Sequence, residues 1–350
     1  MGRIATIPIC KMPLHRIALL LDTSSKRVTI ILMSNRRNFI KTVLAGGALS
    51  ATGAASASSN ESTPAIKKVE RRTLGRTGAD VSILGLGLGS SFYKTYLDDL
   101  ETGHALLHRA LDHGINYWDT CRGYGESEVM IAPVVEKNRD KIYLVTKSGQ
   151  RDYDGFMREA EESLKRLGTD HLDLLHLWNL KPEDDLAAME KGCFKAVTKL
   201  KDEGVIKHYG ITGHSGARLL MDAIQRFDPD AILTVYPCTR DDEGRYEDEL
   251  LPMARERNMG VIGMKVFRRA RNADLKGSDM IRYALSLTGV HSVIVGLDTQ
   301  GHLDENIQMA SNFKMMPKYE QAKLHKEAVH SLRHIPTPWE HPDYVDGSLV

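Results

Sequence analysis

The strongest constraint on the fold is an eightfold alternation of short apolar runs with amphipathic segments between residues 83 and 313. Each run is short and bounded by glycine or polar residues, as expected for buried strands of a parallel sheet. The eight apolar runs are ILGLGLG, INYWDT, KIYLVTKSG, LDLLHLWN, KHYGITGH, DAILTVYP, GVIGMKV and SVIVGLD. The segments with helical spacing are 102–114, 154–168, 183–204, 215–227, 246–260, 276–287 and 303–313.

Strands that alternate with helices predict βαβ crossovers and a parallel sheet. Eight units in about 250 residues predict an α/β protein with a (β/α)8 TIM barrel fold. A doubly wound sheet is the alternative, and it requires a GxGxxG turn after its first strand. Gly85, Gly87 and Gly89 lack a third glycine at the required offset, and no close helix start follows them. We therefore expect the barrel, preceded by an N-terminal β-hairpin punctuated by Gly75 and Gly78.

Composition excludes several other classes of protein. With 42% hydrophobic and 27% charged residues, the chain resembles an ordinary soluble globular protein. A formal net charge of +1 provides no bulk attraction to nucleic acid, so no nucleic-acid partner is expected. The four cysteines lack CxxC or Cys/His ligand spacing, which argues against a structural zinc, an iron–sulfur cluster or a disulfide scaffold. These cysteines are Cys10, Cys121, Cys193 and Cys238.

The N-terminal region has the pattern of an export signal rather than of a barrel element. Arg36 and Arg37 precede a mildly apolar run that ends in Ala-Ser-Ala at 55–57. A basic region, an apolar region and an A-x-A site are typical of a secretory signal, and the paired arginines resemble the twin-arginine export signal. That resemblance implies export of the folded protein to the periplasm, with the export machinery as a partner and no stable membrane insertion after processing. The true start is either Met1 or Met33.

The expected domain organisation follows from these patterns. Apolar runs at 17–21 and 28–33 are too short to cross a bilayer, which needs about 20 residues. The predicted parts are an N-terminal extension with the signal at 1–57, a linker at 58–70, the barrel at 71–335 and a C-terminal tail at 336–350.

Candidate catalytic residues stand where the strands end, which is where barrel enzymes carry their active sites. Asp119 and Tyr124 follow the second strand, and Lys147 ends the third. His176 and Trp178 end the fourth strand. A phenol with an ordinary pKa of about 10 is a slow acid unless a cation stabilises its phenolate, which Lys147 can supply while Asp119 holds it. This set suits proton donation to an alkoxide formed by hydride addition to a carbonyl, a reaction that needs a nicotinamide.

Several ordered motifs between Arg71 and Ala310 resemble the aldo-keto reductase family. The stretch WDTCRGYGESE is similar to the family signature DTAxxYGxSE. The resemblance implies a (β/α)8 fold and NADPH-dependent reduction of a small aldehyde or ketone, and Asp119, Tyr124 and Lys147 match three of its four catalytic positions. The other similar motifs are RTLGRTGADVSILGLG, VTKSG, SLKRLGTDHLDLL, GITGH, GVIGMK, SVIVGL and ENI.

The fourth catalytic position departs from the family pattern. The family commonly reads DLxxxH, but five residues after Asp173 this chain has Trp178, while His176 stands where glutamine or another residue is usual. An indole donates one hydrogen bond but neither accepts one nor titrates. Either His176 reaches the pocket from one layer deeper and Trp178 shapes an aromatic-lined substrate site, or carbonyl polarisation is weak and activity is low.

The cofactor positions that the resemblance implies also depart in part. Thr212 and Gly213 replace the usual Ser-Asn pair at the fifth strand, so the hydroxyl is kept and the amide is lost. His302 stands where NADP-preferring members have a basic residue, and Asp298 in the same loop would repel a phosphate. NADP is expected by resemblance, with NAD as the alternative. The implied cofactor-binding positions are Thr212, Lys265, Gly296, Asp298, His302, Glu305 and Asn306.

Two other functions remain open at this point. The departures from the family pattern would also suit a catalytically impaired nucleotide-binding or regulatory protein of the same fold. Asp119, His176 and His214 could be assembled into a metal-dependent hydrolase site, which the family-like order of motifs argues against. The three arginines at 268–271 either meet the pyrophosphate or form an exposed basic turn.

Overall fold

The computed structural model describes residues 16–22, 27–33, 67–267, 275–332, 335–337, 339 and 344. The chain divides into two compact units, Met1–Glu61 and Ser62–Val350. In the first unit, β1 (Arg16–Asp22) pairs antiparallel with β2 (Arg27–Met33), a pairing that the sequence analysis does not predict. Two apolar runs with a short connection are typical of a hairpin. The sequence analysis interprets this extension only in terms of an export signal and therefore does not predict the pairing. The predicted twin-arginine region at 34–57 lies outside the described residues.

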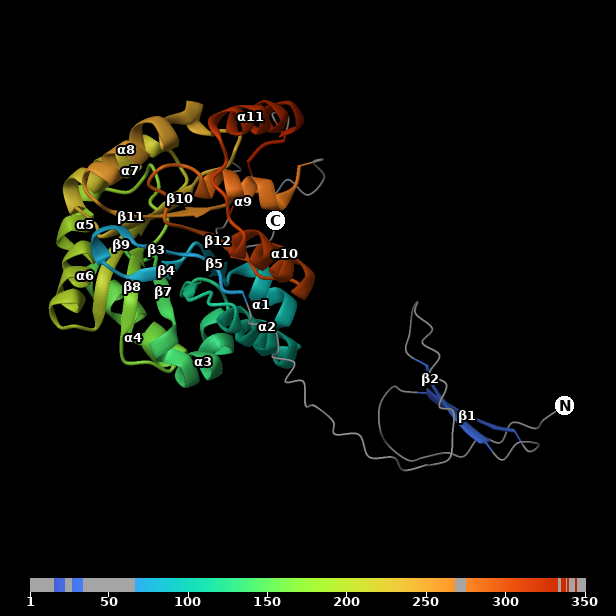
Figure 1. Ribbon diagram of the computed structural model, residues 1–350. Coiled ribbons are helices and arrows are strands. Elements are labelled where there is room, and N and C mark those ends of the chain that lie inside the picture. The colour runs from blue at the N-terminus through green and yellow to red at the C-terminus, as the bar shows by residue number, and fades with distance from the viewer. Residues whose placement is uncertain are drawn as a thin grey trace, which may run out of the picture. The chain divides into compact units, whose positions relative to one another are not determined.

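The second unit is a closed barrel of eight parallel strands in the order β10-β11-β12-β5-β6-β7-β8-β9 (Figure 1). Every one of the eight apolar runs forms a strand, which confirms the predicted (β/α)8 barrel. Strand β7 is buried along its whole length, as expected when side chains face either the barrel interior or the surrounding helices. The strands are β5 (Leu84–Gly87), β6 (Tyr117–Asp119), β7 (Tyr143–Ser148), β8 (Leu172–Leu177), β9 (Ile206–Thr212), β10 (Ala231–Val235), β11 (Gly260–Met264) and β12 (Ser292–Gly296).

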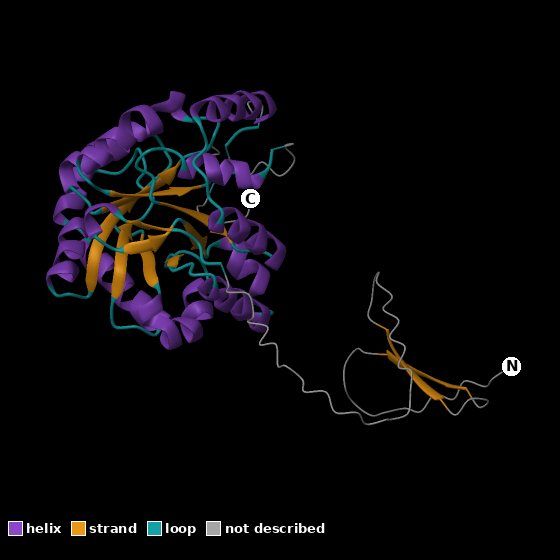
Figure 2. Ribbon diagram, viewed as in Figure 1, coloured by secondary structure: helices purple, strands orange, loops and turns teal. Residues whose placement is uncertain are grey.

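Helices surround the strands of the barrel (Figure 2). Helix α4 ends at Gly168, whose left-handed φ of 64° forms the C-cap that the sequence predicts. Among the described residues, no helix combines the length and the apolar character that a bilayer crossing requires. The helices are α1 (Ser90–Tyr96), α2 (Leu100–Asp112), α3 (Ser127–Asn138), α4 (Tyr153–Leu167), α5 (Leu186–Lys191), α6 (Cys193–Asp202), α7 (Ala217–Phe227), α8 (Leu251–Glu256), α9 (Gly277–Leu285), α10 (Gln300–Ser311) and α11 (Lys318–Leu332).

The predicted β-hairpin closes the amino end of the barrel. Strand β3 (Arg71–Thr73) pairs antiparallel with β4 (Asp80–Ser82), and Leu74 between them is fully buried. Gly75 has a φ of +48°, and a Cβ there would lie 2.4 Å from the carbonyl carbon of Met259. The turn therefore needs glycine both for its backbone conformation and for its close approach to the start of β11.

Several helical elements differ from the prediction, among them α11, which lies beyond the last predicted segment. The segment 183–204 is two helices because Gly192 breaks it, where a Cβ would lie 2.2 Å from the carbonyl oxygen of Arg151. Helix α1 begins at Ser90, directly after the glycine-rich strand, although the sequence analysis finds no close helix start there. The segment from Tyr246 opens with one π-helical turn before α8. In each of these places local spacing alone does not define the helix boundary.

A buried carboxylate network joins β9 to the neighbouring elements. Asp230 accepts hydrogen bonds from Lys201 Nζ at 2.6 Å and from the Tyr209 backbone N–H at 3.1 Å. His208 Nδ1 lies 3.6 Å from the same carboxylate. Burial opposes ionisation of Asp230, but hydrogen bonds from His208, Lys201 and Tyr209 outweigh it and lower the pKa to about 2.

This network predicts a specific acid sensitivity. The pKa of an unfolded Asp is about 3.9, so ionised Asp230 stabilises the fold above that pH and ceases to do so as pH falls toward about 2. We expect Asp230→Asn to lower the melting temperature near neutral pH, with a difference from wild type that shrinks in acid. Thermal unfolding followed by circular dichroism across this pH range measures the effect. The control is Asp202→Asn, an exposed position at the end of α6, and equal, pH-independent losses in both variants would contradict the prediction.

Candidate active site

The loop between β6 and α3 is anchored by the polar residues at the end of the WDTCRGYGESE motif. Ser127 Oγ donates a hydrogen bond of 2.5 Å to the backbone oxygen of Leu88, after β5. Buried Glu128 accepts 2.7 Å from the Thr146 hydroxyl of β7 and lies 3.3 Å from Arg166 of α4. Burial raises the pKa of Glu128, while Thr146 and Arg166 oppose that rise. These contacts fix the loop that carries the candidate phenol to two strands and a helix.

A buried ion pair joins the ends of β6 and β7. Lys147 Nζ donates to Asp119 Oδ1 at 2.5 Å and to the backbone oxygen of Thr120 at 2.6 Å. Asp119 and Lys147 each expose 1% of their surface. Burying either charge alone would be costly, and their contact compensates the lost hydration. The ammonium is therefore held in one place below the rim of the barrel.

Tyr124 lies against this ammonium. The centroid of its ring is 5.0 Å from Lys147 Nζ, within cation–π range. Its ring meets Trp178 edge to face at 5.9 Å with an interplanar angle of 90°. On another side, a Cβ on Gly89 would lie 3.4 Å from Tyr124 Cε2. The structure thus brings Asp119, Lys147 and Tyr124 together from two adjacent strands and one loop.

His176 lies deeper in the barrel, in register with Lys147 on β7 and Gly210 on β9. It is fully buried, and this burial, followed by the Lys147 charge, holds its pKa well below the ordinary value. Backbone groups of Ile211 and Gly210 oppose this lowering, although neither ring nitrogen reaches hydrogen-bond geometry with a described group. The imidazole therefore stays neutral at physiological pH.

Trp178 stands two residues nearer the rim than His176. Its indole packs over two glycines: a Cβ on Gly123 would lie 2.5 Å from the ring, and one on Gly149 would lie 3.1 Å from it. Its backbone N–H donates 2.9 Å to the Ser148 oxygen. The half-buried indole thus forms a wall beside Tyr124, while the histidine expected to touch the carbonyl lies one layer below.

The candidate cofactor residues line the other half of the barrel. Thr212 is the buried last residue of β9, and Gly296 is the last residue of β12. Lys265 follows β11 with a left-handed φ of 54°. On α10, Asn306 is half-buried and exposed Glu305 borders a cavity of about 610 Å³ between α9 and α10, away from the buried ion pair. The arginines at 268–271 lie outside the described residues.

Asp298 and His302 form a pair at the start of α10. His302 Nδ1 lies 2.8 Å from Asp298 Oδ1, and both side chains are partly exposed. Thr299 caps the helix by accepting from the His302 backbone N–H at 3.2 Å. A protonated His302 would therefore have its charge balanced by its own neighbour.

Asn179 is a polar residue at the rim that the sequence analysis misses. It has a left-handed φ of 52°, exposes 8% of its surface, and its Oδ1 is buried without a hydrogen-bond partner among the described groups. The next residue, Leu180, donates its backbone N–H to the Thr212 oxygen at 2.7 Å. An unpaired amide beside Thr212 fits a carboxamide ligand and lies close to where Gly213 lacks one. A left-handed asparagine leaves no periodic signal that could have found it in the sequence.

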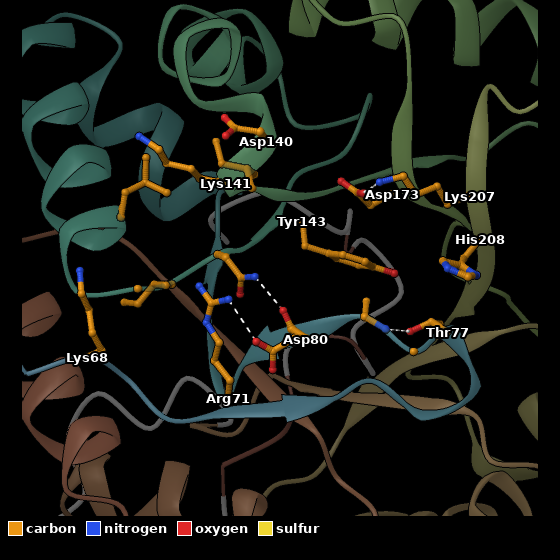
Figure 3. A pocket seen from close by; sticks show the side chains of 17 residues that line it. Lys68, Arg71, Thr77, Asp80, Asp140, Lys141, Tyr143, Asp173, Lys207 and His208 are labelled. Atoms are coloured by element: carbon orange, nitrogen blue, oxygen red, sulfur yellow. Dashed lines mark hydrogen bonds and ion pairs between the residues drawn. The ribbon is translucent and has the colours of Figure 1, made fainter.

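A larger cavity of about 730 Å³ opens at the opposite, amino end of the barrel (Figure 3). Its charged side chains are largely paired with one another. Arg71 lies 3.2 Å from Asp80, and Lys207 lies 2.7 Å from Asp173. Catalytic groups of such barrels sit at the carboxyl ends of the strands, so this cavity is not the candidate active site.

A parallel barrel with a buried Asp–Lys pair beneath a tyrosine at its carboxyl rim has the form of a barrel enzyme equipped for proton transfer. The profile of the Aldo/keto reductase family matches residues 84–274, and the chain belongs to this family. The protein is accordingly an oxidoreductase of a family that acts on carbonyl substrates and generally uses nicotinamide cofactors.

Known proteins agree with this assignment. Pyridoxal 4-dehydrogenase of Microbacterium luteolum is 28% identical over 61% of this chain and 75% of its own length. L-Galactose dehydrogenase of Arabidopsis thaliana is 27% identical over 75% of this chain and 94% of its own. A solved structure from Pseudomonas aeruginosa, assigned to the same family, has a TM-score of 0.59 and 28% identity, covering 69% of this chain and 94% of that chain.

The close packing of His176 predicts that Gly210 cannot be enlarged. A Cβ there would lie 2.4 Å from His176 Nδ1 and 2.8 Å from the Ala231 oxygen. We expect Gly210→Ala to lower the free energy of unfolding by about 1–3 kcal/mol through overpacking. Urea unfolding measures the change. Gly301→Ala is the matched control, since no heavy atom lies within 4 Å of its added Cβ, and equal stability of the two variants would disprove the packing argument.

Proposed function

We propose that the protein transfers a hydride between NADP or NAD and a small aldehyde or ketone, with Tyr124 as the proton donor. The observation that carries this proposal is the buried ammonium of Lys147, paired with Asp119 and 5.0 Å from the centroid of the Tyr124 ring. A fixed cation beside a phenol stabilises the phenolate that remains after the proton leaves.

A nicotinamide cofactor, with its carboxamide held by Thr212 and Asn179, would supply a hydride to the carbonyl carbon. Tyr124 then gives its hydroxyl proton to the resulting alkoxide oxygen, which completes the alcohol. Lys147 stabilises the phenolate, and Asp119 keeps the ammonium in position and charged. In the oxidative direction the same phenolate accepts the proton of the alcohol. The relatives named above are dehydrogenases, so both directions are included in the proposal.

The departures from the family pattern receive distinct roles in this proposal. Trp178, half-buried beside Tyr124, forms the wall against which the substrate carbonyl is placed. His176 is fully buried and neutral, so it supports Lys147 from below and acts on the carbonyl only through that residue. The carboxamide of the cofactor is assigned to Thr212 and to the unpaired amide of Asn179.

The preferred cofactor is proposed to be NADP by resemblance, with NAD accepted. His302 is the basic residue available to a 2′-phosphate, but Asp298 lies 2.8 Å from its ring. A cation already balanced by a carboxylate attracts a phosphate weakly. We therefore expect a small difference in KM between NADPH and NADH.

The decisive experiment is Tyr124→Phe, assayed with NADPH and NADH against a broad aldehyde panel. Loss of the proton donor should lower kcat by about 10²-fold or more and leave nucleotide binding intact. Tyr319→Phe, an exposed tyrosine on α11, is the matched control and should retain full activity. Unchanged turnover in Tyr124→Phe refutes the assignment. Nucleotide binding by the wild type without turnover of any carbonyl would favour the regulatory alternative.

We also propose that the protein is exported to the periplasm by the twin-arginine route. Arg36 and Arg37, the apolar run and the Ala-Ser-Ala at 55–57 support this proposal. In a bacterial host, the wild type should appear in the periplasmic fraction, and replacing both arginines by lysine should retain it in the cytoplasm. Arg27→Lys in the same extension is the control. Recovery of the double variant in the periplasmic fraction at the wild-type level would contradict this proposal.

A further inference from the structure

An arginine in the loop after β7 uses every one of its side-chain N–H groups on neighbouring loops. The guanidinium of Arg151 carries five such donors. Its Nε and Nη2 donate to the two carboxylate oxygens of Asp184 at 2.8 and 2.7 Å. Nη1 donates to the backbone oxygens of Gly149 at 3.2 Å and Trp178 at 3.1 Å, and Nη2 also donates to that of Asn179 at 3.2 Å. Five hydrogen bonds therefore match five donors and fix the plane of the guanidinium.

The backbone around Arg151 is itself anchored to the surrounding helices. Glu159 on α4 accepts a hydrogen bond of 2.6 Å from Ser148 Oγ and one of 3.2 Å from the Gly149 backbone N–H. The backbone oxygen of Arg151 accepts 2.8 Å from the N–H of Cys193, the first residue of α6. The loop that carries the guanidinium is thus fixed to two helices, independently of the contacts that the guanidinium makes.

Asp184 holds the other side of this connection, in the loop after β8. Its Oδ2 also accepts a hydrogen bond of 2.8 Å from the backbone N–H of Lys181. The carboxylate exposes only 11% of its side chain, so water competes little for the pair. An arginine that binds a carboxylate through two parallel hydrogen bonds has a defined orientation relative to it. The pair therefore fastens residues 178–184 to the loop after β7.

The guanidinium holds the chain on both sides of the Asn179 Cα. The oxygens of Trp178 and Asn179 belong to two successive peptide units, so binding both of them limits rotation about φ and ψ of Asn179. Its φ of 52° is left-handed, a conformation that costs energy and persists where neighbouring contacts support it. Arg151 provides that support and thereby sets the directions in which the Trp178 indole and the Asn179 amide leave the chain.

We infer that Arg151 is a positioning residue that fixes Trp178 and Asn179 relative to each other, and with them the substrate carbonyl relative to the nicotinamide carboxamide. This inference rests on the proposed function, in which Trp178 is the wall for the carbonyl and Asn179 binds the carboxamide. Hydride transfer needs a close approach of the reacting carbons, and a misplacement of about 1 Å can cost about 10²-fold in rate. Arg151 therefore acts on the chemical step more than on nucleotide affinity.

The test compares two substitutions of Arg151 with a matched arginine elsewhere. We expect Arg151→Ala to lower kcat about tenfold or more, while the Kd of NADPH, from fluorescence titration, changes less than about threefold. Arg151→Lys keeps a charge for Asp184 but has too few donors for the five contacts, so it should also lower kcat. Arg226→Ala is the control and should retain the wild-type kcat, because Arg226 forms a similar pair with Glu190, at 2.6 Å, on exposed helix surfaces.

A second measurement follows the Trp178 indole without turnover. Acrylamide quenching is measured on the nucleotide-free protein, and the Trp178 component is the difference between each protein and the same protein carrying Trp178→Phe. Loss of the support from Arg151 should raise the quenching constant of this component in Arg151→Ala and Arg151→Lys, and leave it unchanged in Arg226→Ala. Melting temperatures from circular dichroism establish that each variant is folded under the assay conditions.

The outcomes separate the role of Arg151 from the function on which it rests. Lower kcat together with stronger quenching in both Arg151 variants supports the inference. Wild-type kcat in Arg151→Lys overturns it, because the charge pair with Asp184 would then suffice. A loss confined to the melting temperature or to NADPH affinity also overturns it, as does unchanged quenching in both variants. Wild-type protein that turns over no carbonyl refutes the proposed function, and quenching alone then decides whether Arg151 holds Trp178.

Discussion

The buried ion pair of Asp119 and Lys147 is the interaction on which the rest of the site depends. A carboxylate and an ammonium that both lose their water are tolerated when each compensates the other. Adjacent parallel strands meet this requirement, because β6 and β7 end at the same rim, and the Thr120 oxygen accepts a further hydrogen bond from the ammonium. Removing either side chain would leave an uncompensated buried charge. The site therefore keeps both charges only while β6 and β7 lie side by side in the closed barrel.

Glycines around this pair determine where the aromatic rings lie. Gly123 and Gly149 leave the space that the Trp178 indole fills, and Gly89 borders the Tyr124 ring. Edge-to-face contact with Trp178 then limits the rotation of Tyr124. The position of the phenol over the ammonium is thus set by packing. A side chain at Gly123 or Gly149 would displace the Trp178 indole and, through its contact with Tyr124, the phenol, even where the ion pair stayed intact.

The fold and the meeting of Asp119 with Lys147 could be predicted because both follow from the order of the strands. Buried parallel strands are continuous apolar runs, and their carboxyl ends converge, which places Asp119 and Lys147 together from sequence order alone. The break at Gly192 could not be predicted, because its cause is a carbonyl of Arg151 far away in the sequence. Contacts between Lys265 and the end of the chain likewise leave no spacing signal, since they depend on how α11 packs. The sequence therefore identifies residues at strand ends, and it does not identify what covers them.

The two halves of the barrel mouth differ in how their charges are balanced. On β6 to β8 the ammonium is paired with Asp119 and the imidazole is neutral, so the side chains of these strands carry little net charge around Tyr124. On the other half, the charge of a protonated His302 is opposed by Asp298, and Lys265 lies within cation–π distance of Trp339 and Tyr344. Under the proposed function, the pairing of His302 with Asp298 leaves little attraction for a 2′-phosphate. Weak discrimination between NADP and NAD would therefore follow from the carboxylate that lies beside the basic residue available to a 2′-phosphate.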